Sequence, residues 1–68
     1  MEVGDLMASK IRGKRSELGI SQEELAAKLM VNVTTICSWE QGRTTPSAPY
    51  IVQLSELFNV TPNYLFGI

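Results

Sequence analysis

Two helix patterns separated by a break of only three residues constrain the fold of this chain more than any other feature. Ser21 and Glu24 have the residue types and the spacing of a capping box, so a helix should begin there and occupy residues 22–29. Asn32 is a favoured N-cap residue, and a second helix should follow over residues 33–41. The two predicted helices are therefore joined by a tight turn.

The first helix is predicted over residues 6–18 and carries one charge on its apolar side. Met7, Ile11 and Leu18 recur at helical spacing and define one face. Arg15 falls four residues after Ile11 on the same stripe. A charge on the inner face of a helix is costly unless it is paired and hydrogen-bonded. We therefore expect Arg15 to meet an acidic side chain from elsewhere in the fold.

Two further helices are predicted in the C-terminal part of the chain. Ser47 should cap a helix that has Pro49 in its first turn and ends at Asn59. Its apolar face is formed by Ile51, Leu54, Leu57 and Phe58. Thr61 should cap a last short helix that starts with Pro62. No β-strand pattern occurs, so residues 1–68 are predicted to form a single all-α domain of five helices.

Composition argues against several classes of protein. The chain has no histidine and one cysteine, and it contains neither a CxxC motif, nor a phosphate-binding glycine loop, nor a carboxylate cluster at metal-ligand spacing. We therefore expect no enzyme activity, no bound metal and no cofactor. No apolar run approaches the roughly 18 residues of a membrane span, and residues 1–10 lack the apolar region of a signal peptide. A cytoplasmic binding module fits these features.

Charge is distributed unevenly along the chain. The formal net charge is −1, yet all six Lys and Arg residues lie between residues 10 and 43, where four acids leave a local charge of +2 (6 − 4). The net charge is therefore a poor guide to the local field. From charge alone, a solvated surface of mixed sign is the simpler interpretation.

The predicted third helix has two unlike faces. Ile36 and Glu40 are four residues apart and, with Trp39 at their edge, should point inward. The opposite face has no charged residue and is formed by Val33, Thr34, Cys37, Ser38 and Gln41. Short uncharged side chains allow a helix to approach the base edges of DNA, where hydroxyl and amide groups pair with bases and an apolar group meets a thymine methyl. A protein–protein contact is the alternative explanation for this face.

Over residues 11–65, with a helix-turn-helix at 22–41, the sequence resembles the lambda-repressor-like, Cro/cI-type (XRE) helix-turn-helix family. The resemblance rests on "LGISQEELAAKL", on the run "VNVTTICSWEQG", on "RTTP" and on "LFNVTPNYLFG". It implies five helices around one core, with the third helix in the major groove of double-stranded DNA. It also implies a transcriptional regulator from a bacterium or a phage, most often a repressor, which binds a palindromic operator as a homodimer.

The resemblance further implies roles for individual residues. Base contacts fall on Asn32, Val33, Thr34 and Ser38, with Cys37 beside them. Gln22 and Arg43 match positions that contact phosphate, and Gln22 can also brace the third helix. Arg15 matches an arginine that pairs with the glutamate at Glu40, which agrees with its place on the apolar stripe. Two further phosphate contacts are predicted from the residues themselves, at Lys14 and at the edge of Trp39.

Two positions depart from the family pattern. Met30 stands where the turn usually has a glycine in the left-handed region, a conformation that costs other residues about 1–2 kcal/mol. Either the turn is altered, or burial of the Met30 side chain offsets the cost. Ser38 stands where an arginine or glutamine is often found, which favours A·T-rich or methyl-based contacts over guanine readout.

Two other functions fit the same sequence. An antitoxin-like protein would bind a toxin partner and repress its own operon, and an adaptor would keep protein contacts after losing DNA binding. Residues 44–68 contain no cation, so Tyr50, Tyr64 and Phe66 are predicted to lie in the core or in a dimer interface. We expect Cys37 to be a small polarizable contact residue and not a redox sensor.

Overall fold

Local sequence signals set the ends of most helices in this protein. The computed structural model describes residues 3–68. Its helices are α1 (Val3–Leu18), α2 (Gln22–Leu29), α3 (Val33–Glu40), α4 (Ala48–Phe58) and α5 (Pro62–Phe66). No strand occurs in this range, and the predicted all-α fold of five helices is confirmed. None of the helices over residues 3–68 combines the length and the apolar character that crossing a membrane requires.

The start of α2 shows how strong such local signals are. The Glu24 amide donates to Ser21 Oγ and the Ser21 amide donates to the Glu24 carboxylate, each over 3.0 Å, so the predicted capping box is confirmed. Thr61 caps α5, and its Oγ1 accepts from the Tyr64 amide over 3.3 Å. Asn32 occupies the N-cap position of α3 with an extended backbone, but its side chain makes no capping hydrogen bond. The side-chain amide of Asn32 is therefore available to other partners.

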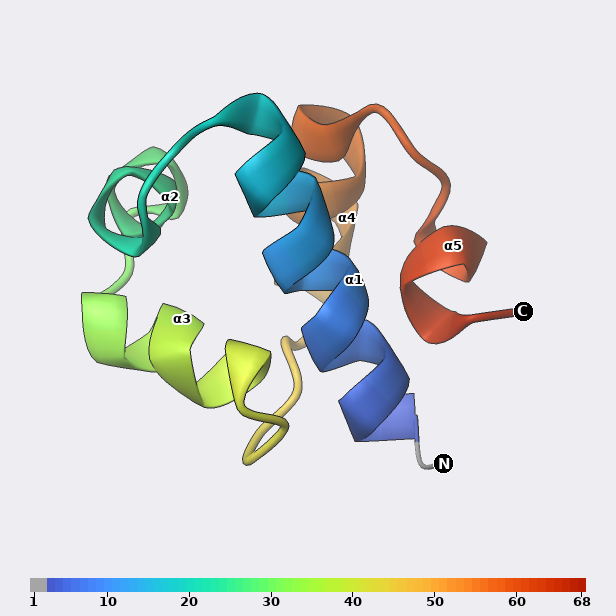
Figure 1. Cartoon of the computed structure of the whole chain (residues 1–68). Helices are drawn as coiled ribbons and strands as arrows, with labels where there is room; N and C mark the ends of the chain where they lie inside the picture. The colour runs from blue at the N-terminus through green and yellow to red at the C-terminus, as the bar shows by residue number, and fades with distance from the viewer. Residues whose placement is uncertain (1–2) are drawn as a thin grey trace.

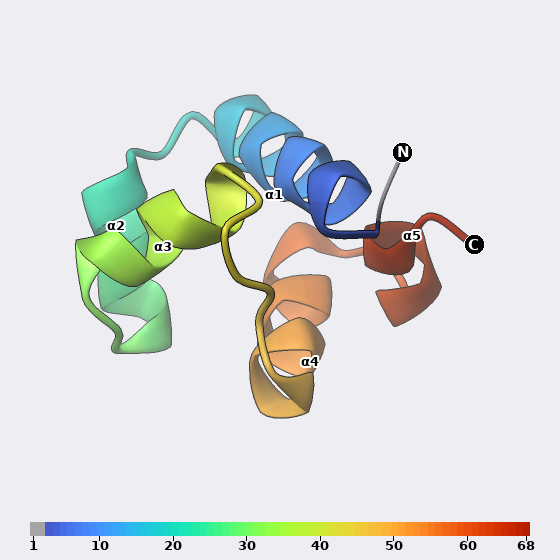
Figure 2. The ribbon, with the colours of Figure 1, turned by 90° about the horizontal axis from the view of Figure 1, so that it is seen from below.

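α1 runs through the middle of the fold. α2 and α3 lie on one side of it and α5 lies on the other, as Figure 1 shows. In the view of Figure 2, α4 is drawn below α1, with α2 and α3 on one side of it and α5 on the other. α1 packs against α3, α4 and α5, while α2 packs against α3. This arrangement supports α3 from α1 and α2 and leaves its remaining face at the surface.

The core forms where the inner faces of the five helices meet. The largest fully buried side chains are Met7, Ile11, Leu25, Ile36, Leu54 and Leu65. Every helix contributes at least one of them, and each such side chain stabilises the fold by about 1.5–3 kcal/mol relative to an exposed position. Ile36 is the anchor of α3 in this core. Its burial fixes which face of α3 points outward.

The turn between α2 and α3 keeps a left-handed residue although it has no glycine. Met30 has φ 59° and ψ 43°, and its amide donates to the carbonyl of Ala27 over 3.2 Å. The Met30 side chain is 91% exposed. The expectation that burial of this side chain offsets the strain is therefore wrong. The turn retains its geometry because the helices on both sides hold it, and the strain remains uncompensated at Met30 itself.

Three details of the helices differ from the prediction. α1 begins at Val3, three residues before its predicted start. Leu18, predicted on the apolar face of α1, is 49% exposed. It is the last residue of α1, and the chain turns away at Gly19, which has φ 70°. Ser55, which was not predicted in the core, is buried, and its hydroxyl is satisfied by donating to the carbonyl of Ile51 over 2.7 Å.

Candidate nucleic-acid interface

An ion pair joins the middle of α1 to the end of α3. Arg15 Nε lies 2.7 Å from Glu40 Oε2, and Arg15 Nη2 donates to Glu40 Oε1 over 3.1 Å. The Glu40 side chain is 3% exposed and that of Arg15 is 16% exposed, so the pair is largely shielded from water. The hydrogen bond to Glu40 raises the pKa of Arg15 above its ordinary value, and burial opposes this only in part. Arg15 thus has the acidic partner that its place on an apolar stripe led us to expect.

Gln22 extends this pair toward the outer face of α3. Its Nε2 donates to Glu40 Oε1 over 3.1 Å, and the Cys37 thiol donates to its Oε1 over 3.2 Å. The first residue of α2 is therefore bonded to both the middle and the end of α3, which is the bracing role implied by its position. Glu40 uses only one of the two Nε2 hydrogens. The second can donate outside the protein, and the phosphate contact of Gln22 stays a prediction.

The outward face of α3, hereafter the outer stripe, is uncharged and accessible along its length. It consists of Val33, Thr34, Cys37, Ser38 and Gln41. Thr34 and Gln41 are exposed and the other three are half-buried. Val33 also packs against the core cluster, so its methyl groups are held in place. Asn32 is exposed directly before the stripe, and together these residues form a surface of short polar and apolar groups.

The loop that follows α3 is tied to the outer stripe. Ser38 Oγ and Thr44 Oγ1 lie 2.8 Å apart, and the Arg43 amide donates to the carbonyl of Ser38 over 3.0 Å. The Arg43 side chain is exposed. A cation that stands just past the end of a helix is well placed to meet a phosphate at the edge of a groove.

Arg12 is a second cation beside α3, although Lys14 was the residue of α1 predicted to contact phosphate. Its Nη1 donates to the backbone carbonyl of Glu40 over 3.4 Å, at the C-terminal end of α3, where a positive charge suits the helix dipole. The Arg12 side chain is exposed. A signal for this placement existed, since Arg12 precedes Arg15 by three residues and so shares a side of α1 with it.

Lys14 lies apart from these residues. Its Nζ is 3.2 Å from the Glu17 carboxylate and 5.2 Å from the centroid of the Tyr64 ring in α5. Lys10 lies over the same ring at 4.5 Å. α5 and α3 are on opposite sides of α1 in Figure 1. The structure therefore does not bring Lys14 to the outer stripe, and this arrangement gives its predicted phosphate contact no support.

Trp39 belongs to the core. It is 4% exposed, and its ring centroid lies 5.5 Å from that of Tyr50 with the planes tilted by 51°. The predicted packing of Trp39 is confirmed, whereas a phosphate contact at its edge stays a prediction. Tyr50 is half-buried in this pair, while Tyr64 and Phe66 are partly exposed on α5.

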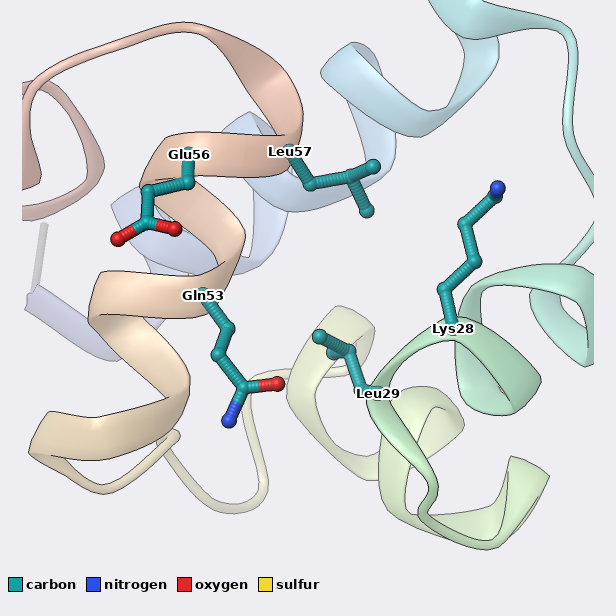
Figure 3. A pocket seen from close by; sticks show the side chains of 5 residues that line it. All are labelled: Lys28, Leu29, Gln53, Glu56 and Leu57. Carbon is teal, nitrogen blue, oxygen red and sulfur yellow. The ribbon is translucent and has the colours of Figure 1, made fainter.

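A hollow between α2 and α4 contains none of the predicted site residues. Its volume is about 440 Å³, and it is lined by Lys28, Leu29, Gln53, Glu56 and Leu57. Figure 3 shows the Gln53 side chain directed toward Leu29, while the Glu56 carboxylate points away from Lys28 and Leu29. The hollow thus gathers no converging set of polar groups, and the outer stripe is the better candidate site.

Comparison with known sequences gives helix-turn-helix proteins as relatives. A family model described as helix-turn-helix matches residues 11–65. The chain is 33% identical over 60 residues to the repressor protein C2 of Salmonella phage P22, in a match that covers 88% of this chain and 28% of the relative. It is 37% identical over 60 residues to an uncharacterized HTH-type transcriptional regulator of Archaeoglobus fulgidus, covering 88% of this chain and 86% of the relative. The chain therefore spans only 28% of the length of the phage repressor.

One solved structure is similar to this protein over most of both chains. It is the crystal structure of the P22 c2 repressor protein in complex with synthetic operator 9T in the presence of Tl⁺. The TM-score is 0.82 at 32% sequence identity, and the match covers 87% of this chain and 89% of that chain. The course of the chain is thus shared with a protein that was crystallised in complex with a synthetic operator.

Proposed function

Because this chain belongs to the Cro/cI-type helix-turn-helix family, we propose that it is the DNA-binding part of a sequence-specific transcriptional regulator and acts as a repressor. In this proposal α3 enters the major groove of double-stranded DNA with its outer stripe toward the bases. A repressor of this kind acts by occupying its operator. The likeness to a repressor crystallised with a synthetic operator supports this function.

The single observation that carries the proposal is the uncharged outer stripe of α3. Glu40 is the one acid in α3, and it is turned inward, 3% exposed and paired with Arg15. No carboxylate of this helix therefore faces the phosphates. This placement is consistent with a chain of net charge −1 binding a polyanion, because the exposed cations Arg12 and Arg43 lie at the C-terminal end of α3.

Contacts to the DNA backbone would fix the position of α3 in the groove. Arg43 and Arg12 stand at the C-terminal end of α3, and the free Nε2 hydrogen of Gln22 lies at the start of α2. The N-terminus of α2 adds the positive end of its helix dipole. Contacts of this kind set register and orientation without carrying sequence information.

Contacts to bases would come from the outer stripe and from Asn32. The methyl groups of Val33 suit a thymine methyl, the Asn32 amide suits an adenine edge, and the hydroxyls of Thr34 and Ser38 suit either donors or acceptors. The Cys37 thiol donates its hydrogen bond to Gln22 Oε1, so Cys37 would present mainly its sulfur surface to the groove. We infer a preference for A·T-rich half-sites, since no arginine on the stripe can read guanine with two hydrogen bonds.

We also propose that the protein binds as a homodimer to a palindromic operator. One recognition helix reads too few base pairs to be selective in a genome. Two copies related by a twofold axis would place their α3 helices in successive major grooves, about 34 Å apart. The antitoxin-like alternative is not favoured, because the similar proteins are named as a repressor and a transcriptional regulator.

Capture of genomic DNA fragments by the purified chain, followed by sequencing, tests this function. Bound fragments should share a short sequence with twofold symmetry. Thr34→Glu adds a charge at an exposed position of the outer stripe and should abolish capture, while Gln53→Glu adds the same charge at an exposed position on α4 and should have little effect. Equal capture by both variants, or no captured fragment at any salt concentration, would contradict the proposal.

A further inference from the structure

A pair of hydroxyl groups links the outer stripe to the loop that follows it. Ser38 Oγ and Thr44 Oγ1 lie 2.8 Å apart, and either atom can be the donor. Ser38 is half-buried on the outer stripe and Thr44 is exposed in the loop. Two hydroxyls carry two protons between them, and the bond that joins them uses one. One proton remains for a partner outside the protein.

The two possible directions of this bond give Ser38 opposite properties. If Thr44 donates to Ser38, then Ser38 can donate its own proton to DNA, and Thr44 offers only lone pairs. If Ser38 donates to Thr44, then Thr44 donates outward, and Ser38 offers only lone pairs. The direction of one hydrogen bond therefore decides whether Ser38 can donate to DNA or can only accept from it.

The position of Thr44 next to Arg43 distinguishes the two directions. Both side chains are exposed, and the bond from the Arg43 amide to the carbonyl of Ser38 holds this segment against the end of α3. Under the proposed function, on which this inference rests, Arg43 lies against a phosphate at the edge of the groove. Phosphate oxygens only accept hydrogen bonds, so Thr44 can meet them only as a donor.

We propose that a phosphate contact at Thr44 forces Ser38 to donate to Thr44, so that Ser38 reads a base amino group as an acceptor. In the major groove the amino groups are N6 of adenine and N4 of cytosine, while guanine and thymine present acceptors and a methyl group. Thr44 is then a positioning residue, because it selects adenine or cytosine through Ser38 and without touching a base itself.

Selection of duplexes from a randomised pool tests this coupling with three variants at accessible positions. Ser38→Ala should remove the preference at one position in each half-site, and this identifies the base that Ser38 faces. Wild type and Thr44→Ser should both lose affinity when a base analogue removes the single major-groove amino group of that pair, N6 of adenine or N4 of cytosine. Thr44→Val keeps the shape of the side chain and removes the hydroxyl, so Ser38 is then free to donate as well. Discrimination against the same pair with its two bases exchanged between the strands should therefore fall by about 3- to 10-fold. Circular dichroism melts check that each variant is folded.

Several outcomes would overturn the inference, and one separates it from the proposed function. The coupling is wrong if Thr44→Val discriminates against the exchanged pair as strongly as wild type, or if removal of the amino group leaves wild-type binding unchanged. It is also wrong if Ser38→Ala changes no position, or if Thr44→Val weakens all sequences alike. If wild type selects no sequence at all, the proposed function itself fails and the inference fails with it.

Discussion

Removal of the Arg15 side chain is the perturbation whose effect the structure defines most sharply. Arg15→Ala would leave the Glu40 carboxylate 3% exposed, with Gln22 Nε2 as its remaining hydrogen-bond donor among the described side chains. Loss of one member of a buried ion pair costs on the order of 3–5 kcal/mol. A domain of this size has a free energy of unfolding of only a few kcal/mol. We therefore expect Arg15→Ala to be largely unfolded at room temperature.

Removal of Arg15 and removal of Glu40 should not lower the free energy of unfolding equally. In Glu40→Ala the guanidinium of Arg15 keeps its hydrogen bond to the carbonyl of Ile20, 2.9 Å from Nη1, and it is 16% exposed, so it can recruit water. A carboxylate that is 3% exposed has less access to water. Arg15→Ala should therefore destabilise more than Glu40→Ala. The double variant should cost less than the sum of the single variants, because no unpaired charge remains in it.

Thermal melts followed by circular dichroism measure these effects. A loss of 3 kcal/mol corresponds to a fall in Tm of at least about 12 °C for a domain of 60–100 residues. Low temperature or a stabilising osmolyte keeps the weakest variants measurable. Additive effects below about 1 kcal/mol for both single variants would refute the reasoning, since they would mean that the pair contributes no more than an exposed surface pair.

Three further predictions concern the turn and the DNA backbone. Met30→Gly should raise the free energy of unfolding by a few tenths to about 1 kcal/mol in urea titrations, because φ is 59° and the exposed side chain has little packing to lose. Asn59→Gly is the control, because Asn59 also has a positive φ but asparagine tolerates this region, so its stability should change less. A Met30→Gly variant that is less stable than wild type would show that the backbone of Met30 is not strained. Arg43→Ala should weaken binding to all duplexes alike and flatten the salt dependence by about one unit per protomer, and an altered selected sequence would contradict a phosphate role. With Arg12 and Arg43 in each protomer, a dimer should show a log–log salt slope of about −4, and a slope near zero would contradict backbone binding.

The sequence predicted best those features that are decided within a few residues. The capping box of Ser21 and Glu24 and the stop at Gly19 depend only on neighbours along the chain, so composition and spacing are enough to find them. Arg15 is a tertiary feature that was still predictable, because a charge on an apolar stripe demands a partner. The inward and outward faces of α3 followed from the helical period alone.

Other features depended on how the helices pack, and the sequence does not contain that directly. The period of α1 places Leu18 on the same face as Met7, yet Leu18 is 49% exposed at the last residue of the helix. Lys14 and Arg12 look alike in sequence, yet one lies beside α5 and the other beside the end of α3. The bond between Ser38 and Thr44 depends on the path of the loop. Side-chain type alone gives no sign of such contacts.

The base preference of a Val33→Gln variant tests most directly the central claim that the outer stripe of α3 reads DNA. Duplexes selected from a randomised pool by this variant and by wild type are compared, with a thermal melt to confirm folding, because Val33 also packs against the core. We expect the preferred base to change at one position in each half-site, with a discrimination of about 1–3 kcal/mol, and the other positions to stay the same. If Val33→Gln selects the wild-type sequence unchanged while Arg43→Ala selects a different one, α3 is not the reading helix and the account is wrong.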